Sequence, residues 1–196
     1  MDDLSSVTQL VLHERQGRDR GWWAQMLACF WPDATVKLSW IDASGTDFVR
    51  RSKEMSGRGD RSVHRLGPPT VHLQGDRALV ELPAGVEFRV DWDGVPADLI
   101  SYTRLNYRLE RRADKWKIKA LDAIYERDTL TPRLPGQLLT VEHLGDRDPY
   151  ALVALYLTRR GYSVGDLLAD DQPEKVEAFY ADAFGWLGQN THAPSD

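Results

Sequence analysis

Two long segments in which apolar and polar residues alternate, 98–111 and 115–127, constrain the fold of this chain more than any other feature. Alternation over such lengths is typical of β-strands that bury one face. The connection at residues 113–114 is short enough for a hairpin, and three shorter alternating segments lie within residues 71–92. We therefore expect a meander of antiparallel strands in the middle of the chain.

Helical periodicity dominates the sequence before these strands. Apolar residues recur at helical spacing over residues 4–16, and a second helix is expected over about 21–30, where Pro32 stops it. Residues 35–40 alternate as a half-buried strand, and residues 46–55 favour a third, short helix. Three helices followed by a meander is an α+β order, so we expect an α+β domain without a parallel sheet.

Composition and charge exclude several classes of protein. The 196 residues are 42% apolar and 28% charged, which suits one domain with a substantial core. The net charge of −5 and the scattered basic residues argue against a nucleic-acid surface. The start of the chain lacks a leader pattern, and the longest apolar run, residues 150–157, is too short to cross a bilayer. We therefore expect a cytoplasmic protein with neither nucleic-acid nor membrane partners.

The sequence also predicts a site without metal or cofactor. Its single cysteine, Cys29, can form neither an internal disulfide nor a thiolate metal site, and its apolar neighbours favour a buried, unreactive thiol. No spacing resembles a zinc or calcium site, and no glycine loop suited to phosphate is present.

The stretch Asp19–Ala34 places an acidic residue before an aromatic-rich helix that leaves through Phe-x-Pro-Asp-Ala into a strand, and a histidine follows in Ser62–Leu66. This pattern resembles the front half of a SnoaL-like, nuclear-transport-factor-2-like domain. Residues 104–111 and 116–118 resemble the penultimate strand and the Trp-x-Ile strand of that family. The resemblance covers about residues 4–128. It implies a cone-shaped α+β barrel, in which a curved antiparallel sheet wraps round the N-terminal helices and encloses a cavity.

The resemblance implies that His64 and Asp19 face each other in this cavity, as in the scytalone dehydratase and bile-acid dehydratase relatives. An imidazole can take and return a proton near neutral pH, and a carboxylate on one ring nitrogen selects the tautomer. The alternatives from the residues alone are a His64 bonded to backbone groups and an Asp19 that caps the helix starting at Gly21.

Further residues are expected to bind the substrate. If Trp116, Ile118 and Asp122 share one face of the last strand, Asp122 lies on the apolar side, where a carboxylate needs a partner or a function. Tyr107 would then direct its hydroxyl into the cavity beside Asp122, although burial against a backbone group is the alternative. The aromatic residues expected to line the cavity are Trp23, Trp40 and Phe88.

One departure from the family concerns the first helix. Family enzymes often carry a tyrosine about one turn before the acidic residue, and Glu14 occupies the corresponding position here. We expect Glu14 to lie on the helix surface, paired with Arg18, because residues four apart on a helix are neighbours. The chain therefore lacks the tyrosine at the position where the family enzymes often carry it.

The last third of the chain extends beyond the family resemblance. We expect a cone domain over residues 1–128, a helical extension over 129–188 and a disordered tail over 189–196. The extension would contain a helix that starts at Asp148-Pro149 and another that starts near Pro173. The second carries an apolar stripe that must pack either on the cone or on a second subunit.

These features favour a cofactor-independent enzyme of the dehydratase or isomerase type. Its substrate would be a small apolar or polycyclic oxygenated molecule. The alternatives are a non-catalytic small-molecule-binding or dimerisation module and a purely structural oligomer, because one fold can serve several functions. By family resemblance we expect a homodimer or homotrimer.

Overall fold

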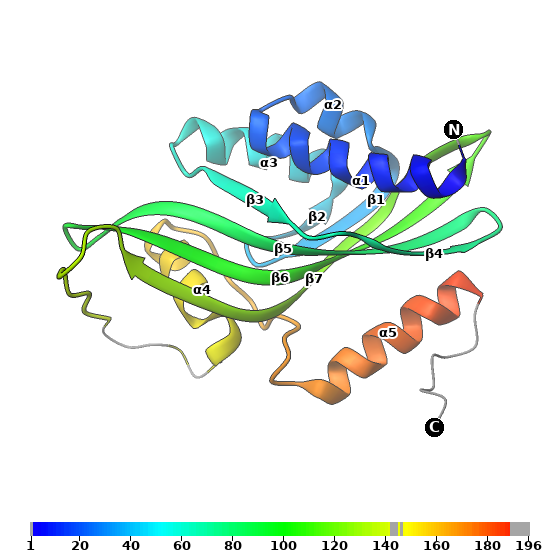
Figure 1. The fold of residues 1–196 in the computed structure, drawn as a ribbon. Helices are drawn as coiled ribbons and strands as arrows, with labels where there is room; N and C mark the ends of the chain where they lie inside the picture. Colours follow the sequence, from blue (N-terminus) through cyan, green and yellow to red (C-terminus); the bar gives the residue numbers. More distant parts are fainter. Residues whose placement is uncertain (1, 142–144, 146, 189–196) are drawn as a thin grey trace.

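The computed structural model describes residues 2–141, 145 and 147–188, and a mixed β-sheet of seven strands forms the centre of this part of the chain (Figure 1). The strand order is β2-β1-β7-β6-β5-β3, and β4 pairs with β5. The strands are β1 (Phe30–Leu38), β2 (Ile41–Ser44), β3 (Ser62–Leu66), β4 (Thr70–Gln74), β5 (Arg77–Trp92), β6 (Val95–Arg112) and β7 (Lys115–Pro132). The sheet curves strongly, so the expected curved α+β architecture is confirmed.

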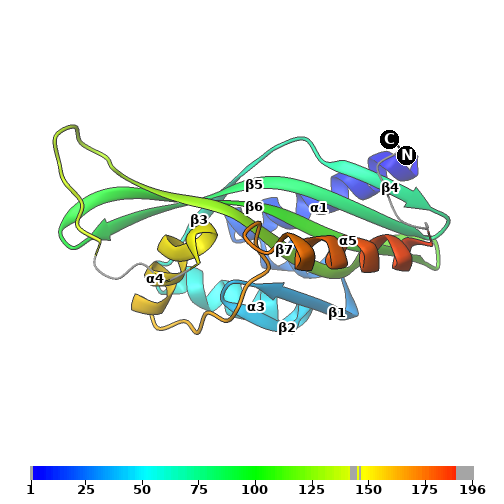
Figure 2. The same ribbon diagram turned by 90° about the horizontal axis from the view of Figure 1, so that it is seen from below.

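Helices cover the sheet from both sides. They are α1 (Asp3–Arg20), α2 (Trp23–Ala28), α3 (Gly45–Gly57), α4 (Ala151–Arg159), which follows the 3₁₀ turn η1 (Asp148–Tyr150), and α5 (Pro173–Leu187). The first three helices lie together on one side of the sheet, and α5 runs along the other side (Figures 1 and 2). None of the helices in the described residues is both long and apolar enough to span a membrane.

The sheet is not antiparallel throughout, which corrects the sequence-based expectation. Strand β1 runs parallel to β7, with Val36 beside Leu121, whereas the pairs of the meander are antiparallel. Only strands joined by a short turn are constrained to pair antiparallel. Strands β1 and β7 are separated by α3 and the whole meander, so their relative direction is decided by the fold and not by a hairpin.

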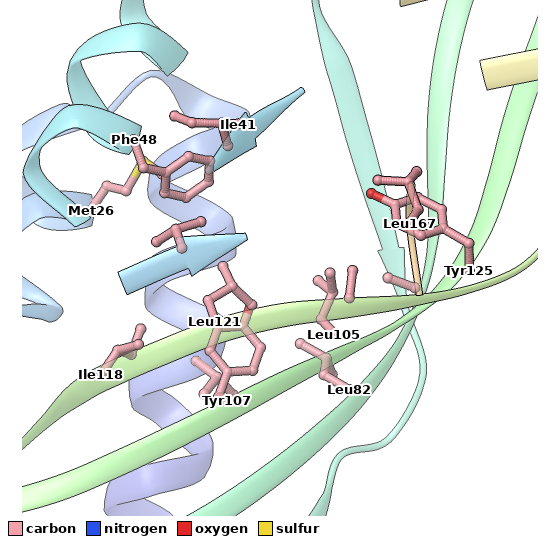
Figure 3. Close-up of a cluster of buried hydrophobic side chains, with 14 of the residues drawn as sticks. Met26, Ile41, Phe48, Leu82, Leu105, Tyr107, Ile118, Leu121, Tyr125 and Leu167 are labelled. Carbon is pink, nitrogen blue, oxygen red and sulfur yellow. The ribbon is translucent and has the colours of Figure 1, made fainter. Parts of the chain in front are cut away.

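The core lies between the sheet and the first three helices (Figure 3). Neighbouring strands contribute Leu82, Leu105 and Tyr107, and Phe48 of α3 packs beside Met26 of α2. Each of these side chains is at most 3% exposed. Full burial of such a side chain stabilises the fold by roughly 1.5–3 kcal/mol, so this layer contributes strongly to holding the helices against the sheet.

A β-bulge in β7 corrects the predicted face of Asp122. The register shifts by one residue at Lys119, so that Ile118 pairs with Leu109 whereas Ala120 pairs with Arg108. A bulged residue reverses the alternation that follows it. Leu121 therefore faces the core, and Asp122 points to the other face of the sheet. The prediction that Ile118 and Asp122 share a face is wrong because it assumed unbroken alternation.

Helix α5 packs on the outer face of the sheet in this chain. Its buried residues Ala183, Phe184 and Leu187 form a small cluster with Leu79 of β5. Asp182 also accepts a hydrogen bond of 2.5 Å from Arg108 of β6. Of the two expected positions for the apolar stripe, the cone itself is therefore the one observed, and the predicted tail from residue 189 lies outside the described residues.

Asp128 connects the end of the sheet to α4 and predicts a pH dependence of stability. Its carboxylate accepts a 2.8 Å hydrogen bond from the backbone N–H of Val153, and burial raises the pKa of Asp128 from 3.8 to about 6. Folding therefore takes up a proton between these two values, and stability should fall as the pH rises through that window. Asp128→Asn should remove this fall in chemical denaturation measured from pH 4 to 7. An unchanged pH profile in the variant would contradict the assignment.

Candidate active site

The end of α1 positions Asp19. Gly17 lies within the helix, and its lack of a side chain allows α2 to pack closely, because a Cβ atom there would lie 3.0 Å from the backbone nitrogen of Met26. Gly21 then ends the helix in a left-handed conformation with φ of +72°, which favours glycine. Helix α2 starts at Trp23 without a side-chain cap. Asp19 therefore lies in the last turn of α1, and the alternative prediction that it caps the second helix is wrong.

Asp19 binds His64 through both carboxylate oxygens. Oδ2 accepts the backbone N–H of His64 at 2.9 Å, and Oδ1 lies 2.6 Å from Nδ1 of the ring. The side chains are 6% exposed for His64 and 15% for Asp19. Because β3 is fixed to β5 by the pairing of His64 with Val86, the two groups are held by rigid elements. The structure thus brings together the two residues that the sequence proposed as a pair.

A second polar chain reaches the other ring nitrogen. Nη1 of Arg15 lies 3.2 Å from Nε2 of His64. Two other nitrogens of Arg15 each bond a different carboxylate oxygen of Glu14 at 2.5 Å, and the Tyr107 hydroxyl donates to Glu14 at 3.1 Å. Glu14 is fully buried. The prediction of a surface Glu14 paired with Arg18 is therefore wrong, because α1 turns this face toward the sheet.

These contacts define the protonation state of His64. Arginine only donates hydrogen bonds, so Nε2 must accept from Arg15 and Nδ1 must carry the proton that binds Asp19. Burial lowers the pKa of His64, and the charges of Arg15 and Arg18 lower it further, against the opposing effect of Asp19. Burial raises the pKa of Asp19, but its bonds to His64 bring the pKa below the ordinary value. The resting pair is a neutral imidazole and a carboxylate.

His64 borders an internal cavity of about 50 Å³. The lining comes from α1, α3, α4 and the inner face of the sheet. It consists of Arg15, Arg18, Leu38, Ser39, Trp40, Phe48, Met55, Ser62, His64, Val86, Phe88, Ser101, Thr103, Leu105, Tyr125 and Val153. On its other side, the pair of His64 and Asp19 borders an open groove of about 600 Å³. The dyad therefore lies between the cavity and a surface groove.

The C-terminal extension completes the cavity. Val153 of α4 lines it directly, and Tyr156 packs on Phe88 with ring centroids 5.3 Å apart. Tyr162 packs on Trp40 at 6.1 Å, and its hydroxyl donates to the buried Asp60 at 3.1 Å. Residues beyond the expected cone domain thus close the cavity, and their removal would expose its apolar lining.

The predicted substrate-binding residues do not all lie at the cavity. Trp40 and Phe88 line the cavity, as expected. Tyr107 faces the inner side of the sheet, but its hydroxyl is bound to Glu14, and Trp23 on α2 is not among the lining residues. Asp122 lies in a different groove, of about 460 Å³, on the outer face of the sheet. The structure therefore does not bring Tyr107 and Asp122 together.

Arg15 and Arg18 are site residues that the sequence analysis missed. Both are at least 95% buried and line the cavity. The helical periodicity of the sequence could have revealed them. The face of α1 that buries Val7 and Val11 also carries Glu14, Arg15 and Arg18 one and two turns later. Charged residues that continue an apolar stripe of a helix must be buried, and burial requires partners or a function.

The pKa of His64 can be measured directly. We expect it below the ordinary 6.5, and we expect Asp19→Asn to lower it further because the bond to Asp19 raises it. Since unfolded His64 binds its proton more tightly, the stability should rise with pH through the window below 6.5. Titration of the ring signals by ¹⁵N NMR checks this value. A pKa above 6.5 in the folded chain would contradict the neutral resting state.

Comparison with solved structures identifies the fold class. A hexachlorocyclohexane dehydrochlorinase, LinA-type3, from Novosphingobium barchaimii superimposes with a TM-score of 0.54 at 16% identity, over 70% of this chain and 94% of that one. A proposed scytalone dehydratase from Novosphingobium aromaticivorans gives 0.53 at 15%, over 69% and 95%. A single-residue variant of Rv3472 from Mycobacterium tuberculosis, a protein of unknown function, gives 0.55 at 18%, over 86% and 94%. At these identities the similarity establishes the fold alone, and two further structures that superimpose on this chain are described as having a cystatin-like fold.

The family follows from the sequence match. The model of the SnoaL-like domain matches residues 1–122, which is more than half of the chain. The chain therefore belongs to the SnoaL-like family, as the resemblance predicted. No curated protein matches it significantly in sequence. The matched region contains Asp19, His64 and both arginines, whereas α4 and α5 lie beyond it.

Proposed function

We propose that this chain is a cofactor-independent acid–base enzyme of the dehydratase or isomerase type, acting on a small oxygenated molecule in the internal cavity. The observation that carries the proposal is the geometry of His64. Its Nδ1 is held by Asp19 at 2.6 Å, while its Nε2 lies beside Arg15 at the cavity wall. The dehydratase and dehydrochlorinase among the structural neighbours give additional support.

His64, Asp19 and Arg15 have separate roles in the proposed reaction. Nε2 of His64 removes a proton from a carbon next to a carbonyl group, and Asp19 stabilises the resulting imidazolium. Arg15, displaced from Nε2 by the substrate, donates its hydrogen bond to the oxygen on which negative charge develops. In a dehydration, the imidazolium returns the proton to the departing hydroxyl group, which leaves as water. In an isomerisation, the proton returns to a different carbon.

The size of the cavity favours a compact substrate. A cavity of about 50 Å³ is roughly one third of the 150 Å³ that accommodates benzene in an engineered protein. A polycyclic molecule would therefore require α4 to move away from Phe88. Of the two kinds of substrate suggested by the sequence, a small oxygenated molecule therefore suits the observed cavity better than a polycyclic one.

Deuterium incorporation tests the proposal without knowledge of the leaving group. The protein is incubated in D₂O with a panel of small ketones, hydroxyacids and hydroxyketones, and the carbon-bound protons are followed by NMR. We expect exchange of one proton next to a carbonyl group with the wild type and none above background with His64→Ala. Equal exchange by the two proteins would reject the dyad as the base.

One observation favours the non-catalytic alternative. Arg15 already occupies Nε2 in the resting state, as it would if the polar chain only stabilised the fold. The same experiment separates the two functions. A binding module would show ligand-induced shifts of the signals of Trp40 and Phe88 without any deuterium incorporation.

A further inference from the structure

Arg18 is a buried cation that forms no ion pair with any of the residues described by the structure. Its side chain projects from the last turn of α1 to the cavity and is 5% exposed. Within the described residues, its guanidinium group has a single hydrogen-bond partner, the sulfur of Met55 at 3.2 Å. Among these residues no carboxylate oxygen lies within 4.0 Å of it.

The neighbouring Arg15 shows that the fold can neutralise a buried arginine. Arg15 is equally buried, and Glu14 binds it through both carboxylate oxygens. Arg18 has no carboxylate partner of this kind among the described residues. The thioether sulfur of Met55, which it contacts, is only a weak hydrogen-bond acceptor. Burial and the charge of Arg15 lower the pKa of Arg18 to about 10, against the opposing charges of Asp19 and Glu14, which act without direct contact; the group still carries its charge at neutral pH. An unpaired buried charge is strongly unfavourable unless something else supplies the opposite charge.

A second unsatisfied group lines the same cavity. The Ser101 hydroxyl, on β6, is buried and has no hydrogen-bond partner in the part of the chain that the structure describes. A hydroxyl can donate to an anion, and the guanidinium group offers parallel N–H donors in a planar fork. Arg18 and Ser101 thus supply donors to the cavity whose acceptors are not provided by the described residues.

We propose that the ligand of this cavity is a short-chain carboxylate whose carboxyl group pairs with Arg18 and accepts a hydrogen bond from Ser101. This inference deepens the proposed function and rests on it for the role of the cavity as a substrate site. The two coplanar oxygens of a carboxylate match the guanidinium fork better than a spherical anion does. The small cavity selects a chain of few carbon atoms.

Pairing of the ligand with Arg18 would also affect the base. The charge of Arg18 is one of the influences that lower the pKa of His64. A carboxylate on Arg18 neutralises that charge, so the imidazole becomes a stronger base only when the cavity is occupied. The substrate would then activate the residue that acts on it.

Calorimetric titration with two probes of nearly equal shape tests the inference. The probes are acetate and its amide, acetamide, in chloride-free buffer at pH 7.5, because these molecules are small enough for a cavity of about 50 Å³. Truncating one member of a buried, hydrogen-bonded charge pair typically costs 2–5 kcal/mol. We therefore expect the wild type to bind the carboxylate at least about 30-fold more tightly than the amide, and Arg18→Gln to lose this preference. Arg51→Gln, which changes an exposed arginine of α3, should retain it.

The thermal stability of Arg18→Gln shows whether a loss of binding reflects the missing charge or a loss of folding. Arg18→Gln should fold with an unchanged or higher unfolding temperature, because it removes an unpaired charge. If it does not fold, Arg18→Lys replaces it and should retain a weakened carboxylate preference. The inference is overturned if the wild type binds neither probe, binds both equally, or binds chloride as tightly as the carboxylate. It is equally overturned if Arg18→Gln keeps the preference.

The outcome is separable from that of the proposed function. His64→Ala should bind acetate in preference to acetamide, as the wild type does, because His64 is not the proposed partner of the carboxyl group. Carboxylate binding without deuterium incorporation in the wild type would reject only the catalytic function. Deuterium incorporation into neutral ketones alone, without carboxylate preference, would reject only the inference.

Discussion

Glu14→Gln is expected to lower the free energy of unfolding by about 3–5 kcal/mol, the range typical of breaking a buried ion pair from one side. Glu14 is fully buried, and it is the carboxylate that Arg15 binds with bonds of 2.5 Å. The amide retains the shape of the side chain but leaves Arg15 as an uncompensated charge beside Tyr107. Chemical denaturation at pH 7.5 measures the difference.

Glu54→Gln is the matched control for this prediction. Glu54 accepts a hydrogen bond of 2.7 Å from Arg50 on α3, but both side chains are more than half exposed. Exposed pairs contribute little to stability, since water solvates the remaining partner, so this variant should unfold almost like the wild type. A loss of similar size in the two variants would show that Glu14 does not neutralise a buried charge.

His64→Ala is expected to lower turnover by about 10²–10⁴-fold on any substrate identified by deuterium incorporation, the usual contribution of a general acid–base residue. His64 is the group whose Nε2 reaches the cavity wall and whose Nδ1 is held by Asp19. Arg15 and the cavity remain in the variant and account for the residual rate. Steady-state kinetics with the purified variants measure the effect.

The control for His64 is a second histidine near the same surface groove. His13 is exposed on α1, before Asp19 in sequence, and it lines the groove rather than the internal cavity. His13→Ala should retain wild-type turnover. Circular dichroism of both variants separates a catalytic loss from a folding loss. Full activity of a folded His64→Ala would exclude this residue as the base.

The strongest sequence predictions came from local patterns that the tertiary structure preserved. The alternation of β5 and β6 and the apolar stripe of α5 correspond to observed elements, whereas the aromatic helix already ends at Ala28 and Pro32 lies within β1. Asp19 and His64 were also predicted as a pair, through a family resemblance that the SnoaL-like match confirms. Local periodicity and short motifs survive folding because they depend on neighbours in the chain.

The errors arose where one residue interrupted a pattern. The bulge at Lys119 reversed the face of Asp122, and alternation alone contains no signal for a bulge. The first helix was expected over residues 4–16, but it continues to Arg20, and the close approach of Met26 of α2 depends on the missing side chain of Gly17. Both corrections depend on contacts between segments that are distant in the sequence.

The sequence by itself therefore determined the class of fold, the family and the candidate dyad of this SnoaL-like chain. Only the tertiary structure decided which charged residues of α1 are buried, that Glu14 neutralises Arg15, and that Arg18 has no counter-ion among the described residues. The physical reason is that burial and pairing are set by the packing of α1 against the sheet and the extension. A charge on a helix has no electrostatic environment until those surfaces meet.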